Sequence, residues 1–86
     1  MKEVRWNLLK SERVKRTRGV SFEEILRAQL VAVQKHPKKE HQKVMLFEYK
    51  EYIWVVPYVE SEDEIFLKTL YPSRAYTRIY RRGELQ

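Results

Sequence analysis

The sequence predicts a single α+β domain with a small antiparallel β-sheet, two N-terminal helices and a short C-terminal helix. Capping residues mark two helix starts in the first third of the chain, and three apolar, aromatic-rich runs separated by short charged turns follow. Such runs are typical of an antiparallel meander. An arginine-rich segment then ends the chain. Eighty-six residues are enough for one modest core, so we expect residues 1–86 to form one domain.

The N-terminal segment predicts a short strand followed by a surface helix. Val4 and Trp6 alternate with charged residues, which is the period of a half-buried strand over residues 3–6. Asn7 can cap the next helix, which we expect over residues 8–18. This helix has few apolar residues and should lie mostly in solvent.

A second helix begins at the run Ser21-Phe22-Glu23-Glu24, which is a capping box. In this motif the serine and the glutamate three residues later each satisfy a backbone donor, and flanking apolar residues can add a hydrophobic staple. We expect the helix to span residues 22–28 and a strand to follow over residues 30–35. The apolar residues of that strand could also continue the helix, but their β-branched members favour a strand.

Three apolar runs, residues 44–49, 52–59 and 65–70, predict the strands of the meander. The dipeptide Lys50-Glu51 between the first two lacks the Asn or Gly that a tight two-residue turn prefers. We therefore expect a longer or distorted connection there.

Prolines and a glycine mark further boundaries. Pro57 cannot donate a hydrogen bond to a sheet, so it predicts an edge or bulge position. Pro72 or Ser73 can open a terminal helix that Gly83 can close. The polar segment 36–43 contains a proline and predicts an exposed loop, a frequent location of functional residues.

The charge balance predicts an anionic partner. Eighteen Lys and Arg face twelve Asp and Glu, which gives a formal charge of +6 and a pI near 9.7. Basic side chains are concentrated in residues 1–19, whereas acidic ones crowd residues 60–64. A small basic domain attracts polyanions or acidic proteins. We expect the acidic segment to cap a hairpin and keep the sheet soluble.

Several classes of protein are disfavoured by composition. The chain has no cysteine, so it has neither a disulfide framework nor a thiolate zinc site, as is common in a reducing compartment. The longest apolar run has eight residues, far below the roughly 20 that span a bilayer. The N-terminus lacks the apolar segment of a secretory signal. We expect a cytoplasmic protein without a metal, a cofactor or a membrane partner.

Short motifs at four places along the chain occur together. They are Trp6-Asn7, the run Arg18-Gly19-Val20-Ser21-Phe22-Glu23-Glu24, His36-Pro37 with Gln42-Lys43, and Ser73-Arg74 followed by Thr77 and Tyr80. This combination resembles the BrnT-like toxins of bacterial type II toxin-antitoxin systems, a branch of the RelE-type ribonucleases. The resemblance implies a RelE-like fold and metal-independent cleavage of mRNA, which inhibits translation. It also implies a cognate antitoxin as partner, of the ribbon-helix-helix type.

Cleavage of RNA without a metal requires a base, a cation that stabilises the charged phosphorane, and an acid for the leaving oxygen. Arg74 is the first candidate for the cation, because a guanidinium can bind two phosphate oxygens at once and the family motif retains this arginine. Lys68 shares a strand face with Phe66 and Leu70. It either lines a cleft, where it could act as the base, or extends to solvent at the rim of the sheet.

Tyrosine and histidine supply further candidates for proton transfer. Tyr76 and Tyr80 lie four residues apart and share one helix face, where they could pack, donate a proton or stack on a base. His36 is the preferred histidine and His41 the second, if their loop folds over the cleft; an exposed polar role is the alternative for both. The catalytic set predicted from the sequence is therefore Arg74 with Lys68, Tyr80 or His36.

Other basic residues are expected to bind the RNA backbone without transferring protons. These residues are Arg78, Arg81, Arg82 and Lys43. The surplus of aromatic residues in the meander predicts that some of them meet a protein partner. Two other functions fit the same features: a noncatalytic nucleic-acid-binding module, and an inactive toxin relic that still binds its antitoxin.

Overall fold

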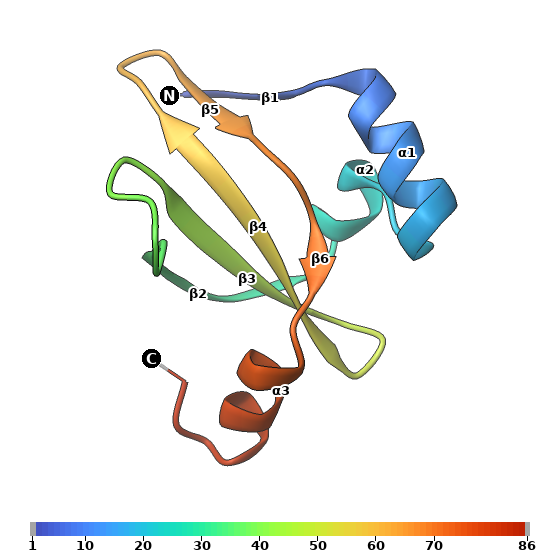
Figure 1. The fold of residues 1–86 in the computed structure, drawn as a ribbon, viewed down its shortest axis with the longest axis vertical. Coiled ribbons are helices and arrows are strands. Elements are labelled where there is room, and N and C mark those ends of the chain that lie inside the picture. The colour runs from blue at the N-terminus through green and yellow to red at the C-terminus, as the bar shows by residue number, and fades with distance from the viewer. Residues whose placement is uncertain (1, 86) are drawn as a thin grey trace.

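The structure is a computed structural model that describes residues 2–85. Within these residues, three helices and a six-stranded sheet make up the fold (Figure 1). In chain order the elements are β1 (Glu3–Trp6), α1 (Leu8–Arg18), α2 (Phe22–Ile25), β2 (Gln29–Lys35), β3 (Lys43–Tyr49), β4 (Tyr52–Glu60), β5 (Glu64–Leu67), β6 (Tyr71–Pro72) and α3 (Arg74–Arg81). The predicted α+β class is confirmed.

The sheet is mixed, which corrects the prediction of an antiparallel sheet. Its strand order is β1-β5-β4-β3-β2, and β6 pairs with β4 beyond the end of β5. All neighbours are antiparallel except β1, which runs parallel to β5. A parallel pair cannot be joined by a tight turn, and here residues 7–63 separate the two strands. The sequence pattern of β1 carried no information about this distant partner.

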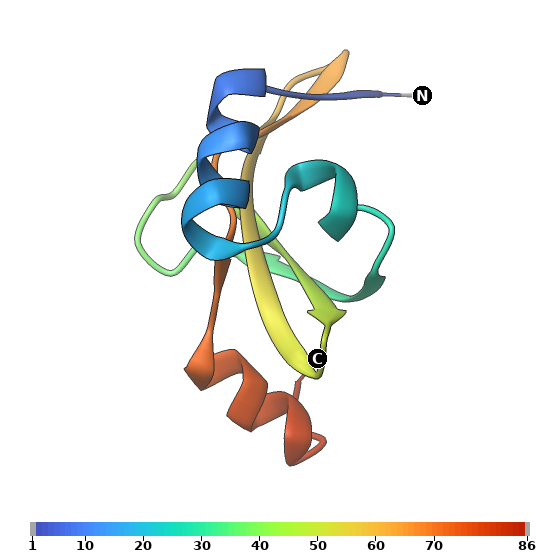
Figure 2. The ribbon, with the colours of Figure 1, turned by 90° about the vertical axis from the view of Figure 1, so that its right-hand side faces the viewer.

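Apolar side chains cover both faces of the sheet. One cluster joins α1 and α2 to the sheet through residues that include Val14, Phe22, Trp54 and Val56. The second cluster, on the opposite face, consists of Val44, Leu46, Ile53 and Val55, with Tyr76 and Tyr80 of α3 packed against it. Figures 1 and 2 both show α1 and α2 at one end of the sheet and α3 at the other.

Helix α1 has the predicted bounds and capping residues. The Asn7 side chain accepts a hydrogen bond from the Lys10 amide at 3.0 Å, and Gly19 ends the helix with φ at +83°. Val14 is buried, whereas Leu8 and Leu9 are 69% and 73% exposed. The expected surface helix is confirmed.

The capping box of α2 forms as predicted, but the helix ends at Ile25 and not near residue 28. The next two amides, of Arg27 and Ala28, bond to carbonyls three residues back, at Glu24 and Ile25. Such bonds tighten the last turn of a helix. Strand β2 then begins at Gln29, which confirms the predicted change from helix to strand.

Two side-chain contacts fasten α1 to α2. The buried Ser11 hydroxyl donates to Glu23 Oε1 at 2.8 Å and accepts from the Phe22 amide at 3.3 Å. Lys15 forms an ion pair with Glu24, whose carboxylate also accepts the Ser21 amide. The Lys15 hydrogen bond is the largest cause that lowers the pKa of Glu24 to about 2, followed by the backbone bond at Ser21.

Of the two alternatives predicted for the β3–β4 connection, a longer or a distorted one, the longer one is wrong, because the connection is a two-residue turn with a strained backbone. Tyr49 pairs with Tyr52, and the two residues between them, Lys50 and Glu51, have φ of +53° and +63°. This left-handed conformation disfavours side chains with a Cβ atom. Pairing of the two long apolar strands outweighs the local preference of the turn residues.

Pro57 lies in the central strand β4, not at an edge of the sheet. Its carbonyl accepts from the Lys68 amide at 2.8 Å, so its nitrogen also faces the segment between β5 and β6. The strand predicted over residues 65–70 is interrupted in that segment, because β5 ends at Leu67 and β6 begins at Tyr71. Pro57 has no N–H to donate, and its nitrogen therefore faces the gap between β5 and β6.

We expect Glu51→Gly to raise the free energy of unfolding by about 1 kcal/mol, because glycine removes the left-handed penalty at this position. Urea unfolding measures the change. Gly19→Ala is the matched control: its φ is +83° and an added Cβ would meet nothing within 4 Å, so this variant should be less stable for conformational reasons alone. Equal stability of E51G and the wild type would contradict the assignment of strain to the turn.

The Glu24 carboxylate should also make stability depend on acid pH. Its pKa is lowered from 4.5 to about 2 in the folded protein. A lowered folded-state pKa stabilises the protein above the unfolded value, and the contribution is lost as pH falls from 4.5 towards 2. Glu24→Gln should flatten the stability profile in this window, as measured by urea titrations at several pH values. Glu12→Gln, on the exposed side of α1, should retain the wild-type slope.

Candidate functional site

Helix α3 carries a group of cations that we call the α3 arginine cluster: Arg74, Arg78, Arg81 and Arg82. The other three follow Arg74 by four, seven and eight residues, so all four lie on one side of the helix, with Arg82 as its C-cap. With Tyr52 and Thr77 they line a pocket of about 330 Å³. The sequence predicted Arg74 as the phosphate ligand and the other three as backbone-binding residues, and the structure brings all four together.

The helix is held on the sheet by Thr77, which is 3% exposed. Its hydroxyl oxygen accepts from the Ile53 amide at 2.8 Å and donates to the Ser73 carbonyl at 2.7 Å. The Ser73 side chain in turn caps the helix by accepting from the Tyr76 amide. This chain of bonds fixes where α3 begins relative to β4, and so positions Arg74.

The electrostatics of the cluster favour an anion. Within residues 2–85, none of the four arginines forms an ion pair with a carboxylate. Arg81 donates to the Glu51 carbonyl at 3.0 Å, at the strained β3–β4 turn. Four guanidinium groups that line one pocket repel one another, and a bound phosphate offsets part of this repulsion.

Lys68 lies in a different place, in a groove between α1 and β5. The groove, which we call the α1–β5 groove, has a volume of about 260 Å³ and is lined by residues that include Leu9, Lys10, Arg13, Phe66 and Lys68. The Lys68 ammonium lies 5.7 Å from the centre of the Phe66 ring. Its side chain is exposed, and it does not line the pocket of Arg74.

Tyr80 packs against the sheet, and its hydroxyl donates to Glu48 Oε1 at 2.9 Å. This hydrogen bond, with burial as a smaller cause, raises the pKa of Tyr80. Tyr76 packs in the same apolar cluster. The packing role considered for both tyrosines is therefore what the structure shows, and neither lines the pocket of Arg74.

His36 organises its own loop. Its Nδ1 atom accepts from the amides of Lys38 and Lys39 at 3.0 and 3.1 Å. His36 and His41 line a surface pocket made only of residues 35–43, away from the α3 arginine cluster.

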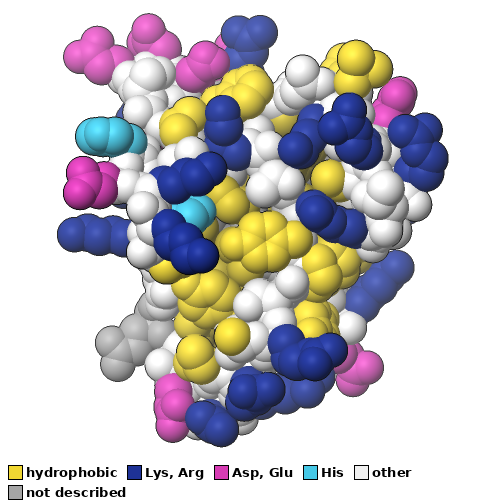
Figure 3. Space-filling model, viewed as in Figure 1, with side chains coloured by type: hydrophobic (Ala, Val, Ile, Leu, Met, Phe, Trp, Pro, Cys, Tyr) yellow, Lys and Arg dark blue, Asp and Glu magenta, His cyan; other side chains and the backbone are white. Residues whose placement is uncertain are grey.

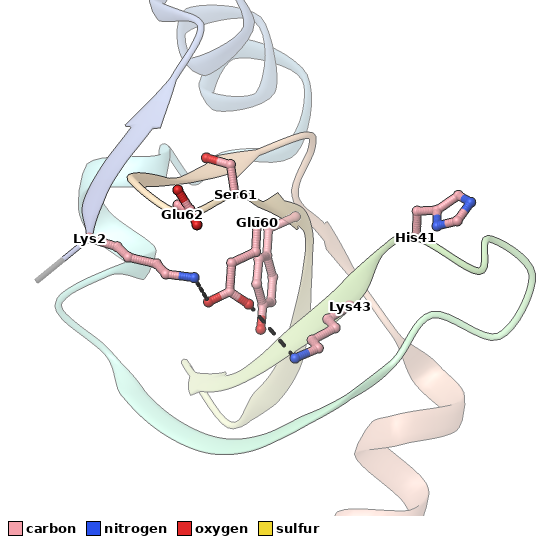
Figure 4. A pocket seen from close by; sticks show the side chains of 7 residues that line it. Lys2, His41, Lys43, Glu60, Ser61 and Glu62 are labelled. Carbon is pink, nitrogen blue, oxygen red and sulfur yellow. Dashed lines mark hydrogen bonds and ion pairs between the residues drawn. The ribbon is translucent and has the colours of Figure 1, made fainter.

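Lys43 faces a carboxylate. Its ammonium lies 3.7 Å from Glu60, which also bonds Lys2 at 2.6 Å (Figure 4). The bond with Lys2 is the largest cause that lowers the pKa of Glu60. Burial and then the charge of Glu60 raise the pKa of Tyr58 in the same pocket. Lys43 is thus partly neutralised, unlike the arginines of α3.

Two sets of residues at these sites were not predicted. Tyr52 of the α3 pocket was predicted only as an aromatic strand residue and Thr77 only as a residue of the family motif, and Lys10 and Arg13 were counted only towards the net charge. Lys10 and Arg13 are three apart on α1, which was a detectable sign that they share a face. Lys10 and Arg13 lie near Lys68 because β1 pairs with β5, and this pairing was not predicted.

Neither a metal cluster nor a membrane helix is present in the described part of the chain. Within residues 2–85, no three His, Cys, Asp or Glu side chains lie close enough together to hold a metal ion. No helix of this range is long and apolar enough to cross a membrane.

Comparisons with known proteins gave no match: no family model fits the chain, and neither curated proteins nor solved structures yielded a similar one.

We expect Thr77→Val to lower the free energy of unfolding by about 1–3 kcal/mol, because it leaves the buried Ile53 amide without an acceptor. Urea unfolding tests this. Thr17→Val is the control, since the Thr17 hydroxyl is exposed and bonds only within α1. If both variants were equally stable, Thr77 would not anchor α3.

Proposed function

We propose that this protein is the toxin of a type II toxin-antitoxin pair, an endoribonuclease that binds mRNA at the α3 arginine cluster. The observation that carries RNA binding is the convergence of Arg74, Arg78, Arg81 and Arg82 on one pocket without a carboxylate partner within residues 2–85. Arginine binds phosphate through two parallel hydrogen bonds. The resemblance of the chain's motifs to BrnT-like toxins supplies the proposed reaction.

In this reaction the 2′-oxygen of a ribose attacks the adjacent phosphorus and the bond to the 5′-oxygen breaks. The products are a 2′,3′-cyclic phosphate and a 5′-hydroxyl. Arg74 stabilises the negative charge that develops on the phosphorane oxygens. One proton leaves the 2′-hydroxyl and another reaches the 5′-oxygen. We assign the proton that reaches the 5′-oxygen to the hydroxyl of Tyr52, which shares the pocket with Arg74, in preference to Lys68, Tyr80 and His36, and the proton of the 2′-hydroxyl passes to water.

The proposal includes an antitoxin of the ribbon-helix-helix type as the partner in the cytoplasm. An acidic segment of such a protein would compete with RNA for the same unpaired arginines. Binding of the antitoxin would therefore block the site by occupying its charges.

A second function, RNA binding without cleavage, is favoured by one specific observation. The three proton carriers suggested by the sequence, Lys68, Tyr80 and His36, all lie outside the pocket that contains Arg74. A protein of this kind, including a toxin relic, would bind RNA in a salt-dependent manner and leave the strand intact.

The test is incubation of the purified protein with single-stranded RNA in the presence of a chelator. We expect cleavage, and we expect Arg74→Ala to lower its rate by about 10²–10³, the usual cost of removing one group that stabilises transition-state charge. Arg27→Ala, which removes an exposed arginine outside the pocket, should cleave at the wild-type rate.

The outcomes separate the two functions. Salt-dependent binding without cleavage by the wild type would support the second function, and undiminished cleavage by R74A would reject the assigned site. Growth arrest on induction of the chain, relieved by an adjacent gene product, would support the toxin-antitoxin assignment.

A further inference from the structure

The α1–β5 groove forms because of the parallel pairing of β1 with β5. The register pairs Trp6 with Leu67 at the ends of the two strands. Beyond this pair the chain after Trp6 enters α1, and the chain after Leu67 continues to Lys68. Helix α1 starts there and presents Lys10 and Arg13, one turn apart, beside Lys68. Three cations from two distant parts of the chain therefore line one hollow.

The three cations of the groove differ from Lys2 and Lys43 in their ion pairing. Within residues 2–85, Lys10, Arg13 and Lys68 form no ion pair, whereas Lys2 and Lys43 share the carboxylate of Glu60. Among the described residues, no acidic one lines the groove. Like charges gathered in one hollow destabilise the free protein and favour an anion there.

The groove also has apolar surface suited to a base. Phe66 is half-buried and lies beneath the Lys68 ammonium, and Leu9 on the opposite wall is 73% exposed. An aromatic ring with cations around it is the combination that binds unpaired nucleotides, because the ring stacks on a base while the cations contact the backbone. Stacking of this kind requires a base that is not already stacked in a duplex.

The groove and the α3 arginine cluster lie at different ends of the molecule. Figure 3 shows Lys and Arg side chains over α1 and over α3 on the same face, with hydrophobic side chains between them. The longest extent of the protein is 35 Å. At about 3.4 Å per nucleotide of a stacked strand, about ten nucleotides would cover this length.

We propose that the α1–β5 groove is a second RNA-binding site, which holds backbone phosphates and one base of an unpaired strand whose other part lies on the α3 arginine cluster. This inference rests on the RNA binding proposed above. It gives Lys68 a role in binding and not in proton transfer, and it makes the length of the RNA a determinant of affinity.

The test compares two 2′-O-methyl RNA strands, of about four and about fourteen nucleotides, only the longer of which can reach both sites. The 2′-O-methyl group removes the attacking hydroxyl, so binding is measured without cleavage. The variant K10A/R13A/K68A should bind the longer strand about tenfold more weakly and the shorter strand as the wild type does. Its slope of log affinity against log salt for the longer strand should fall by about 2.

A matched control removes the same charge elsewhere. R16A/R27A/K39A changes three exposed cations outside the groove, and it should retain most of the affinity and the salt slope for the longer strand. Phe66→Leu keeps an apolar side chain without the ring, and it should weaken binding of the longer strand by about tenfold through lost stacking. K10Q/R13Q/K68Q replaces the alanine variant if circular dichroism shows that the latter is unfolded.

The failures are distinguishable. If the wild type binds neither strand, the proposed function and this inference both fail. If the wild type binds RNA and the groove variant behaves like the control, only the inference fails. Equal loss of affinity for both strands would also overturn it.

Discussion

Burial of strand β4 on both faces is the constraint on which the rest of the structure depends. Its residues from Ile53 to Tyr58 are all buried: Ile53 and Val55 belong to one apolar cluster, and Trp54, Val56 and Tyr58 belong to the other. Helices α1 and α2 cover one face, and α3 covers the other. Because β4 supplies both clusters, each helix is positioned relative to the same strand. The helices α1 and α3, which contribute to the two proposed sites, therefore pack in clusters built on the same strand.

The distribution of charge follows from this arrangement. The core takes apolar side chains almost exclusively, so eighteen basic residues must share a small surface. The acidic residues near the β4–β5 turn can neutralise only the lysines that reach them, as Glu60 does for Lys2 and Lys43. The cations of α3 and of the α1–β5 groove lie beyond that reach. That these cations form no ion pair within residues 2–85 follows from topology as much as from composition.

The predicted site was recovered only where its residues are close in sequence. Arg74 and Arg78 are one helical turn apart, so local periodicity was enough to place them together. Lys68 follows β5. The residues that surround it depend on where β5 ends and on the pairing of β5 with β1. Tyr80 and His36 had hydroxyl and imidazole groups of the right kind, but Glu48 and the loop amides already bind them. Residue type alone could not reveal these partners.

The sequence by itself determined the helix starts at Asn7, Ser21 and Ser73, the α+β class and the excess of positive charge. Caps and alternating patterns act over a few residues, so they can be detected without knowledge of the fold. Only the tertiary structure decided the parallel β1–β5 pair, the tight turn at Lys50-Glu51 and the break in the strand beside Pro57. In each of these the burial of long apolar strands outweighs local preference, because many packed side chains together contribute more free energy than one turn or one proline costs.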